Sequence, residues 1–253
     1  VYKRQEFREL RRLMTFKGLE GELDMLQGMI EEAIFNPSDL SLKQDVLLHG
    51  LARLEKKVEA EFNGLYLDQI RQLMFKVRMF GLHFASLDIR QDARVVTKAF
   101  KSLLEAQEGA AALARFEAMD EADALDFLFA YDTVFEETLE EERHQDVIES
   151  LRAMQEIQRH NGEAGCHRYI LSNCSGAYHM AILHAMAKAS GWESSLTVDL
   201  VPLFESIQDL DGARAEMQKL YMHPVYAAHL DLRGGDQTVM LGFSDGTKDG
   251  GYL

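Results

Sequence analysis

Residues 196–210, which read LTVDLVPLFESIQDL, contain the signals that decide the fold. The apolar run up to Phe204 has the length and composition of a buried strand. Glu205 follows it directly, and Ser206 stands where the N-cap of the next helix, over residues 207–220, is expected. A buried strand that leads straight into a helix is typical of a parallel α/β architecture.

Three further segments have the character of buried strands, namely residues 82–90, 167–173 and 238–243. Segments with helical periodicity lie between these strands, most clearly at residues 177–189. Strands that are joined through helices pair in parallel, either in a doubly wound sheet or in a barrel, and the pattern alone leaves both open. We therefore expect a helix-rich α/β fold.

The first part of the chain is helical by its period. Leucine and isoleucine recur at three-to-four spacing between Leu19 and Ile34, as one buried helix face requires. We expect an all-helical lead-in over residues 1–80. An α/β segment follows over residues 81–253, with a helical insertion at about residues 92–165.

The last helix of that insertion has a start signal and an apolar face. Thr133 and Glu136 have the spacing of a capping box, which predicts that the helix begins there. Val147, Leu151 and Met154 recur at helical spacing, so we expect them to form its buried face.

Composition limits the function classes. The formal net charge of −15, from 27 Lys and Arg against 42 Asp and Glu, would repel nucleic acid and anionic membrane surfaces, so neither is an expected partner. No apolar run reaches the roughly 18 residues of a membrane span.

Cys166 and Cys174 are too few for a disulfide framework or a thiolate zinc site, which fits a reducing cytoplasm. Neither end has the signals of a natural terminus, and we expect an internal piece of a longer protein.

A polar side chain lies at or just past the carboxyl end of each predicted strand: Arg90, Asn173, Glu205 and Asp245. The carboxyl ends of parallel strands meet at one edge, where α/β barrels keep their active sites. Magnesium prefers one or two protein carboxylates, with waters and substrate oxygens as its other ligands, so Glu205 and Asp245 suit it in type and number. Either carboxylate alone is more often a helix cap or a surface ion-pair partner.

Two cations have matching candidate roles. Arg90 could clamp a phosphate or carboxylate, although Asp88, on the same side of the strand, is an equally good partner for it. Lys248, three residues after Asp245, could place an ammonium beside the metal and neutralise a second anion such as bicarbonate. The loop expected over residues 246–251 could expose backbone amides to an oxyanion.

Three segments together resemble phosphoenolpyruvate carboxylase: FASLDIRQ at residues 84–91, VPLFESIQDL at residues 201–210 and MLGFSDGTKDGG at residues 240–251. The second is similar to the family's Pro-Leu-Phe-Glu-Thr metal motif, and the third to its Gly-Tyr-Ser-Asp-Ser-Ala-Lys-Asp-Ala-Gly motif. Their order and separation also match. The resemblance is clear from about Phe80 onward.

This resemblance implies a carbon–carbon lyase that forms oxaloacetate and phosphate from phosphoenolpyruvate and bicarbonate without biotin. In the family's reaction, bicarbonate attacks the phosphate to give carboxyphosphate and an enolate, and carbon dioxide released in place is captured. By position, Glu205 and Asp245 hold Mg²⁺ or Mn²⁺, and Arg90 contacts the anion derived from phosphoenolpyruvate. Lys248 is a catalytic and substrate-binding residue that positions bicarbonate. The complete enzyme is expected to be a cytoplasmic homotetramer.

The resemblance further implies a TIM-type barrel, of which this chain would carry only the first part after its helical lead-in. The family's upstream Thr-Ala-His-Pro-Thr motif and downstream Phe-His-Gly-Arg-Gly-Gly loop, which supply a catalytic histidine and arginines, are absent from the sequence. We expect the isolated chain to be inactive and, because its sheet edges are open, self-associating.

Two alternative functions stay open. One is another magnesium-dependent enolpyruvate enzyme, such as a pyruvate kinase-like phosphotransferase, and the other is an acidic helical interaction module without catalysis.

Overall fold

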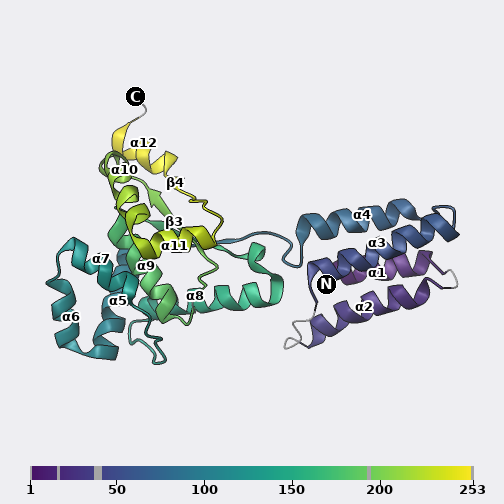
Figure 1. Ribbon diagram of the computed structural model, residues 1–253, viewed down its shortest axis with the longest axis horizontal. Coiled ribbons are helices and arrows are strands. Elements are labelled where there is room, and N and C mark those ends of the chain that lie inside the picture. Colours follow the sequence, from purple (N-terminus) through teal and green to yellow (C-terminus); the bar gives the residue numbers. More distant parts are fainter. Residues whose placement is uncertain (1, 16–17, 37–41, 193–194, 252–253) are drawn as a thin grey trace. The chain divides into compact units, whose positions relative to one another are not determined.

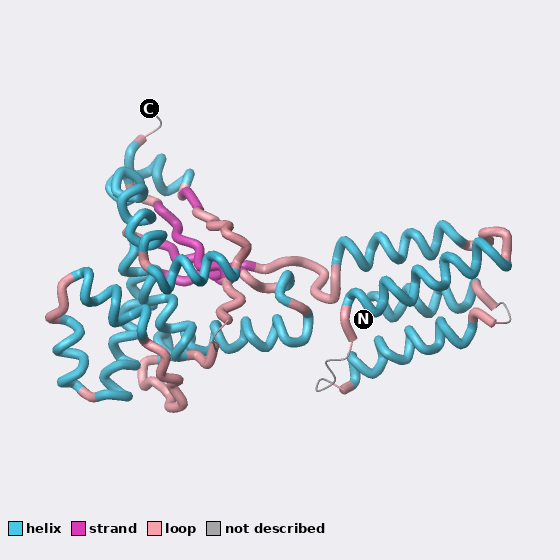
Figure 2. The backbone as a smooth tube through the Cα atoms, viewed as in Figure 1, coloured by secondary structure: helices cyan, strands magenta, loops and turns pink. Residues whose placement is uncertain are grey.

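The computed structural model describes residues 2–15, 18–36, 42–192 and 195–251. The chain divides into two compact units. The first contains Val1–Ser86 and Ile157–Gly165, and the second contains Leu87–Glu156 and Cys166–Leu253. Figure 1 labels the α-helices of both units together with β3 and β4, and Figure 2 shows the strands gathered in the second unit.

The first unit is built on a bundle of helices. Within the described residues these are α1 (Tyr2–Leu13), α2 (Glu20–Phe35), α3 (Gln44–Glu61) and α4 (Leu67–Phe80). Each helix turns one apolar face inward, as the three-to-four spacing predicts. Leu23, Leu26 and Ile30 of α2 are buried, together with Leu51 of α3 and Val77 of α4. The predicted helical character of this part of the chain is confirmed, because burying these stripes is what stabilises helices of this length.

The second unit contains a parallel sheet, whose described strands follow the order β1–β2–β3–β4. Their bounds are β1 (Asp88–Asp92), β2 (Arg168–Ser172), β3 (Asp199–Phe204) and β4 (Met240–Leu241). In register, Arg90 lies opposite Ile170, and Ile170 lies opposite Val201. The expected helix-rich α/β fold with parallel pairing is confirmed, while closure of the sheet into a barrel stays a prediction.

A helix follows each of these strands along the chain, and the helices after β1, β2 and β3 belong to the connections that lead to the next parallel strand. These helices are α5 (Ala93–Glu108), α9 (Ala177–Ala189), α10 (Ile207–Met222) and α12 (Phe243–Gly250). The other helical elements in the described part are α6 (Ala110–Glu117), α7 (Glu121–Ala130), α8 (Glu142–Asn161), the short 3₁₀ helix η1 (Glu163–Gly165) and α11 (Pro224–Leu232). Helix N-termini therefore lie within a few residues of the strand ends, as the sequence around Ser206 indicates.

Two predicted element starts lie far from those in the structure, the first because of backbone conformation and the second because of a hydrogen bond to a distant helix. The strand expected to begin at residue 82 begins at Asp88, because Gly81 and Phe84 have φ angles of 48° and 67°, which a strand does not accommodate. The helix expected to begin at Thr133 begins at Glu142. There the backbone N–H of Phe135 donates to the carbonyl of Ala189 at 2.8 Å, so this stretch bonds to another element. The predicted face of the helix, with Val147, Leu151 and Met154, is buried as expected.

The prediction of a loop over residues 246–251 is also wrong, because most of this segment belongs to helix α12. The N–H of Gly246 donates to the carbonyl of Gly242 at 2.7 Å, and the N–H of Gly251 donates to that of Thr247 at 2.9 Å. These amides are used within the helix and its end, so they are not offered to an oxyanion.

Candidate functional site

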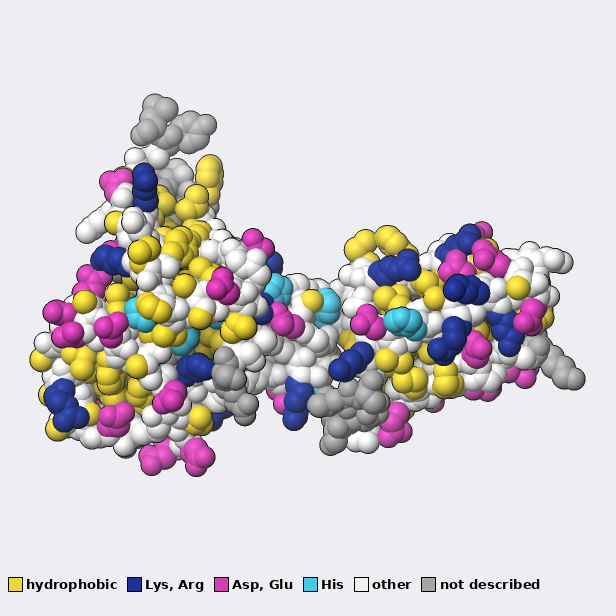
Figure 3. Space-filling model, in the orientation of Figure 1, with side chains coloured by type: hydrophobic (Ala, Val, Ile, Leu, Met, Phe, Trp, Pro, Cys, Tyr) yellow, Lys and Arg dark blue, Asp and Glu magenta, His cyan; other side chains and the backbone are white. Residues whose placement is uncertain are grey.

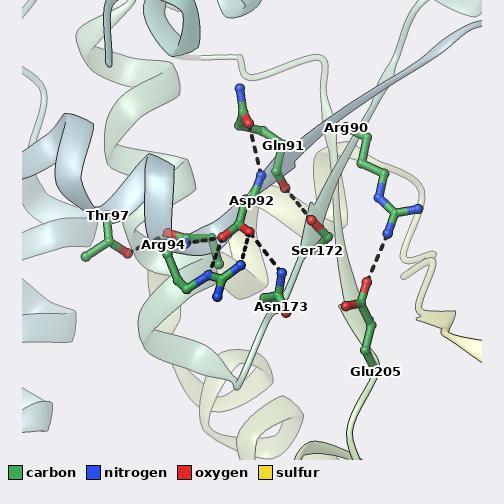
Figure 4. A network of polar contacts seen from close by, with 9 residues as sticks. Arg90, Gln91, Asp92, Arg94, Thr97, Ser172, Asn173 and Glu205 are labelled. Carbon is green, nitrogen blue, oxygen red and sulfur yellow. Dashed lines mark hydrogen bonds and ion pairs between the residues drawn. The ribbon is translucent and has the colours of Figure 1, made fainter. Parts of the chain in front are cut away.

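Arg90 and Glu205 form an ion pair at the carboxyl edge of the sheet. Arg90 belongs to β1 and Glu205 follows the last residue of β3, and the guanidinium Nη2 donates to Oε1 of Glu205 at 2.9 Å (Figure 4). Strand β2 lies between β1 and β3 in the sheet, so the pair spans the end of the middle strand. The Glu205 side chain is 15% exposed, and that of Arg90 is 50% exposed. A carboxylate this buried needs a cationic or hydrogen-bonding partner, which Arg90 supplies.

Asp88, the alternative partner expected for Arg90, pairs with a different arginine. Its carboxylate is 3.7 Å from the guanidinium of Arg168, at the opposite end of β1 and β2. Arg90 is therefore held by a group at the carboxyl edge. Its half-exposed guanidinium keeps further N–H groups with which it can bind an anion.

Asp245 and Lys248 lie on α12, the helix that follows β4. Lys248 Nζ is 3.4 Å from Oδ1 of Asp245, one helical turn earlier, and both side chains are well exposed. An exposed pair of this kind contributes about 0–1 kcal/mol to stability, so it leaves both groups able to exchange partners with a ligand. The Lys248 ammonium thus lies beside the Asp245 carboxylate, and its role next to a metal and bicarbonate stays a prediction.

The corner that carries Glu205 adjoins the corner that leads to Asp245. The N–H of Gly242 donates to the carbonyl of Phe204 at 2.9 Å, immediately before Glu205. A Cβ placed on Gly242 would lie only 3.0 Å from Cγ of Glu205, so the glycine backbone packs directly against that side chain. Glycine allows this close approach of strand β4 to the β3–α10 corner. The two predicted metal carboxylates thus come from adjoining corners at one edge of the sheet.

A second polar group at the same edge was not singled out by the sequence reasoning. Asp92, the last residue of β1, accepts from Nε and Nη2 of Arg94 at 3.0 and 2.6 Å (Figure 4). It also accepts from Nδ2 of Asn173 at 2.9 Å. The hydrogen bonds from Arg94 are the main reason why the pKa of Asp92 is lowered. The signal that could have found Asp92 is its position directly before α5, because Asp is a preferred N-cap.

Asn173, one of the predicted strand-end residues, therefore contacts Asp92 and not the Arg90–Glu205 pair. Its backbone has a φ of 51°, a left-handed conformation that asparagine tolerates better than most residues. Next to it, Ser172 Oγ donates to the carbonyl of Gln91 at 3.2 Å. Side chains thus tie the carboxyl ends of β1 and β2 together just beyond Arg90.

The donor set suits a divalent ion that takes few protein ligands. Among the described residues, no group of three or more His, Cys, Asp or Glu side chains is arranged to hold a metal. Glu205 and Asp245 are two carboxylates at adjoining corners, and in the described contacts each has one oxygen engaged by a cation, Oε1 and Oδ1 respectively. The second oxygen of each remains for a metal ligand bond. One or two protein carboxylates are what Mg²⁺ takes, so these residues fit the ion in type and number.

These features define a class of protein. The chain is an α/β protein whose arginine and carboxylate groups gather at the carboxyl edge of a parallel sheet, where enzymes of this architecture bind their ligands. The family model described as phosphoenolpyruvate carboxylase matches residues 6–253. The chain belongs to the phosphoenolpyruvate carboxylase family.

Curated relatives carry the same name. The phosphoenolpyruvate carboxylase of Azoarcus sp. (strain BH72) is 36% identical over 194 residues, which is 73% of this chain and 21% of that protein. Those of Xanthomonas euvesicatoria pv. vesicatoria (strain 85-10) and Chromobacterium violaceum (strain ATCC 12472) are 30% and 33% identical, over 97% and 82% of this chain. The chain spans only 26% and 24% of the length of these two relatives. No helix among the described residues is long and apolar enough to cross a membrane.

Proposed function

We propose that the complete protein carrying this chain converts phosphoenolpyruvate and bicarbonate to oxaloacetate and phosphate, with Mg²⁺ or Mn²⁺ and without biotin. Family membership supports the reaction. The observation that carries the assignment of residues is the 2.9 Å pair between Arg90 and Glu205. It brings an anion-binding cation and a metal-binding carboxylate to one point on the edge where such enzymes bind substrate.

Each of the four residues has a role that its surroundings support. Arg90, half exposed and fixed at one nitrogen by Glu205, binds the phosphate or carboxylate of phosphoenolpyruvate through its other N–H groups. Glu205 and Asp245 hold the divalent ion. When bound, this ion supplies positive charge beside the substrate oxygens on which negative charge develops. Lys248, the most exposed of the four, positions bicarbonate through its ammonium.

The sheet supports a barrel that is completed by further strands. Met240 and Leu241 of β4 are 38% and 64% exposed, and Phe243 just after it is 84% exposed, which is unusual for apolar residues in a parallel sheet. Figure 3 shows apolar side chains at the surface of both units. We therefore propose a TIM-type barrel in the complete protein. The isolated chain would be inactive and self-associating through this open edge.

The test follows oxaloacetate formation by the complete protein, with and without Mg²⁺. Turnover that needs bicarbonate and a divalent ion, and that is lost in Glu205→Gln and Asp245→Asn, supports the assignment. Turnover that needs a nucleotide instead would favour a pyruvate kinase-like phosphotransferase. A melting temperature that does not respond to Mn²⁺ would favour a non-catalytic interaction module, because a ligand bound only by the folded state raises it.

The isolated 253-residue chain is tested separately. We expect it to form oligomers in sedimentation and to give no oxaloacetate. Oxaloacetate formation by the isolated chain would show that it needs neither the missing histidine motif nor further strands. The cytoplasmic location and the tetrameric state of the complete protein are further parts of the proposal, which fractionation and sedimentation of that protein would test.

A further inference from the structure

Two arginine–carboxylate pairs lie at the carboxyl edge of the sheet, and each arginine is held by a different carboxylate (Figure 4). Arg90 pairs with Glu205 at 2.9 Å. Arg94 is bound to Asp92 through two side-chain contacts, at 3.0 and 2.6 Å, and its backbone N–H also donates to Asp92 at 2.8 Å. Three hydrogen bonds to a single carboxylate hold Arg94 more firmly than an ordinary surface pair would.

Arg94 lies within the electrostatic reach of Glu205. Its pKa is raised mainly by Asp92, and the charge of Glu205 raises it further. Arg90 and Asp92 are two residues apart on β1, so their side chains leave the strand on the same side. The Arg94 side chain is 71% exposed, so without Asp92 it has room to swing toward the next carboxylate.

The position of Arg94 affects how well Glu205, the proposed metal ligand, can bind a metal. A divalent cation binds a carboxylate less well when another positive charge approaches that carboxylate, because the two cations repel each other. Glu205 already has one cationic neighbour in Arg90. A second one would compete with the metal for its oxygens.

We propose that Asp92 is a positioning residue that holds Arg94 away from Glu205, so that Glu205 keeps a single cationic neighbour and can bind a divalent cation. This inference rests on the proposed function, because it takes Glu205 to be a metal ligand. Asp92 acts through Arg94 and does not itself contact the metal or the substrate.

A purely structural role for Asp92 makes a different prediction. Asp92 is the N-cap of α5 and also ties β1 to Asn173 of the next strand end. If this were its whole role, replacing it would lower stability, and removing Arg94 as well would not repair the loss. Asparagine at position 92 keeps an oxygen for the N-cap but carries no charge, so it separates charge from capping.

The experiment measures Mn²⁺ binding to the complete protein at low ionic strength, by the loss of the free-ion signal in electron paramagnetic resonance. We expect Asp92→Asn to weaken Mn²⁺ binding about threefold to tenfold, and high salt to reduce the difference. Arg94→Gln alone should bind Mn²⁺ as well as or better than the unmodified protein. The double variant Asp92→Asn/Arg94→Gln should regain the original affinity to within about twofold, because its net charge at this edge is restored.

Glu205→Gln distinguishes an error in the proposed metal site from an error in the proposed role of Asp92. If it binds Mn²⁺ as tightly as the unmodified protein, the metal site of the proposed function is wrong and the role of Asp92 falls with it. If Glu205→Gln weakens binding but Asp92→Asn does not, only the role of Asp92 is overturned. The same holds if the double variant stays as weak as Asp92→Asn. Should Asp92→Asn unfold, Asp92→Ser, another capping residue without charge, takes its place with the same expected outcomes.

Discussion

Oδ2 of Asp249, in the last turn of α12, accepts a hydrogen bond from the backbone N–H of Ile207 at 2.9 Å. Ile207 is the first residue of α10, so one helix caps the N-terminus of another. The N–H of Asp209 is capped locally by Ser206 at 3.1 Å. Because α12 carries Asp245 and Lys248, this contact ties both residues to the corner that holds Glu205.

Removing this cap should loosen α12. We expect Asp249→Ala to lower the free energy of unfolding of the complete protein by about 1 kcal/mol. The amide of Ile207 should also exchange faster with deuterium, and Mn²⁺ affinity should fall several-fold because Asp245 is less well placed. Asp249→Asn keeps an acceptor oxygen and serves as the control. Equal exchange of the Ile207 amide in all three proteins would contradict the capping role.

Two glycines beside Glu205 should respond differently to an added methyl group. The Cβ of Gly242→Ala would meet Cγ and Cα of Glu205 at 3.0 and 3.3 Å, so the side chain has to move, and we expect Mn²⁺ binding to weaken at least about fivefold. The Cβ of Gly246→Ala would lie 3.6 Å from the carbonyl oxygen of Glu205, an ordinary contact. That variant should bind Mn²⁺ normally and gain up to about 1 kcal/mol of stability from better helix propensity. Calorimetry with Mn²⁺ compares the two, and equal affinities would contradict the prediction.

Substitution of Arg90 should affect the substrate more than the metal. We expect Arg90→Gln to raise the KM for phosphoenolpyruvate by about tenfold or more, because the guanidinium donors are lost. Mn²⁺ affinity should not fall, since removing a cation beside Glu205 does not disfavour another cation. Arg168→Gln is the matched control, because Arg168 pairs with Asp88 at the other end of the strands. Steady-state kinetics would contradict the assignment if both variants kept the original KM.

Acid should destabilise the second unit through two buried histidines. Burial lowers the pKa of His184 to about 3 and that of His229 to about 4, against 6.5 as the ordinary value. Both side chains are less than a tenth exposed, and their ring centroids are 6.2 Å apart. Since the unfolded chain takes up protons at a pH where the folded one does not, stability is complete above about pH 6.5 and declines as the pH falls toward the folded values.

We expect this decline to reach between about 2 and 3 kcal/mol per histidine near pH 4.5, because one pKa unit corresponds to about 1.4 kcal/mol. Urea unfolding between pH 7 and 4.5 measures it. His184→Leu/His229→Leu should flatten the dependence on pH, whereas substitution of the exposed His49, in the first unit, should leave it unchanged. An equally steep dependence in the double variant would refute the assignment to these two side chains.

Local patterns in the sequence predicted much of this protein because they depend on short-range physics. The apolar stripe between Leu19 and Ile34 requires a helix with one buried face, and the structure has α2 there. The apolar run that ends at Phe204 requires a buried strand, and Ser206 caps the helix after it, as its hydroxyl and position indicate. The same patterns placed Glu205 directly after a strand end, whereas Arg90, which was expected at the end of its strand, lies in the middle of β1, because the strand continues to Asp92.

In two places where the sequence misled, a partner far along the chain decided the outcome. The capping-box spacing at Thr133 is a valid local signal, but the backbone at Phe135 bonds to Ala189, 54 positions away, and the helix begins later. The glycines after Asp245 suggested a loop, yet the segment is helical, and Asp249 at its end bonds to Ile207.

The sequence by itself therefore determined most of the elements, their parallel pairing and the residue types near the strand ends, because period, capping and side-chain chemistry act over a few residues. Only the tertiary structure decided which charges meet. Arg90 and Asp88 are neighbours in sequence, but Arg90 pairs with Glu205, 115 positions away, because the sheet order places β3 one strand beyond β2. Arg94 pairs with Asp92 for the opposite reason, since it lies in the first turn of the helix that Asp92 caps. Pairing of charges depends on distance in space, which the order of residues along the chain does not contain.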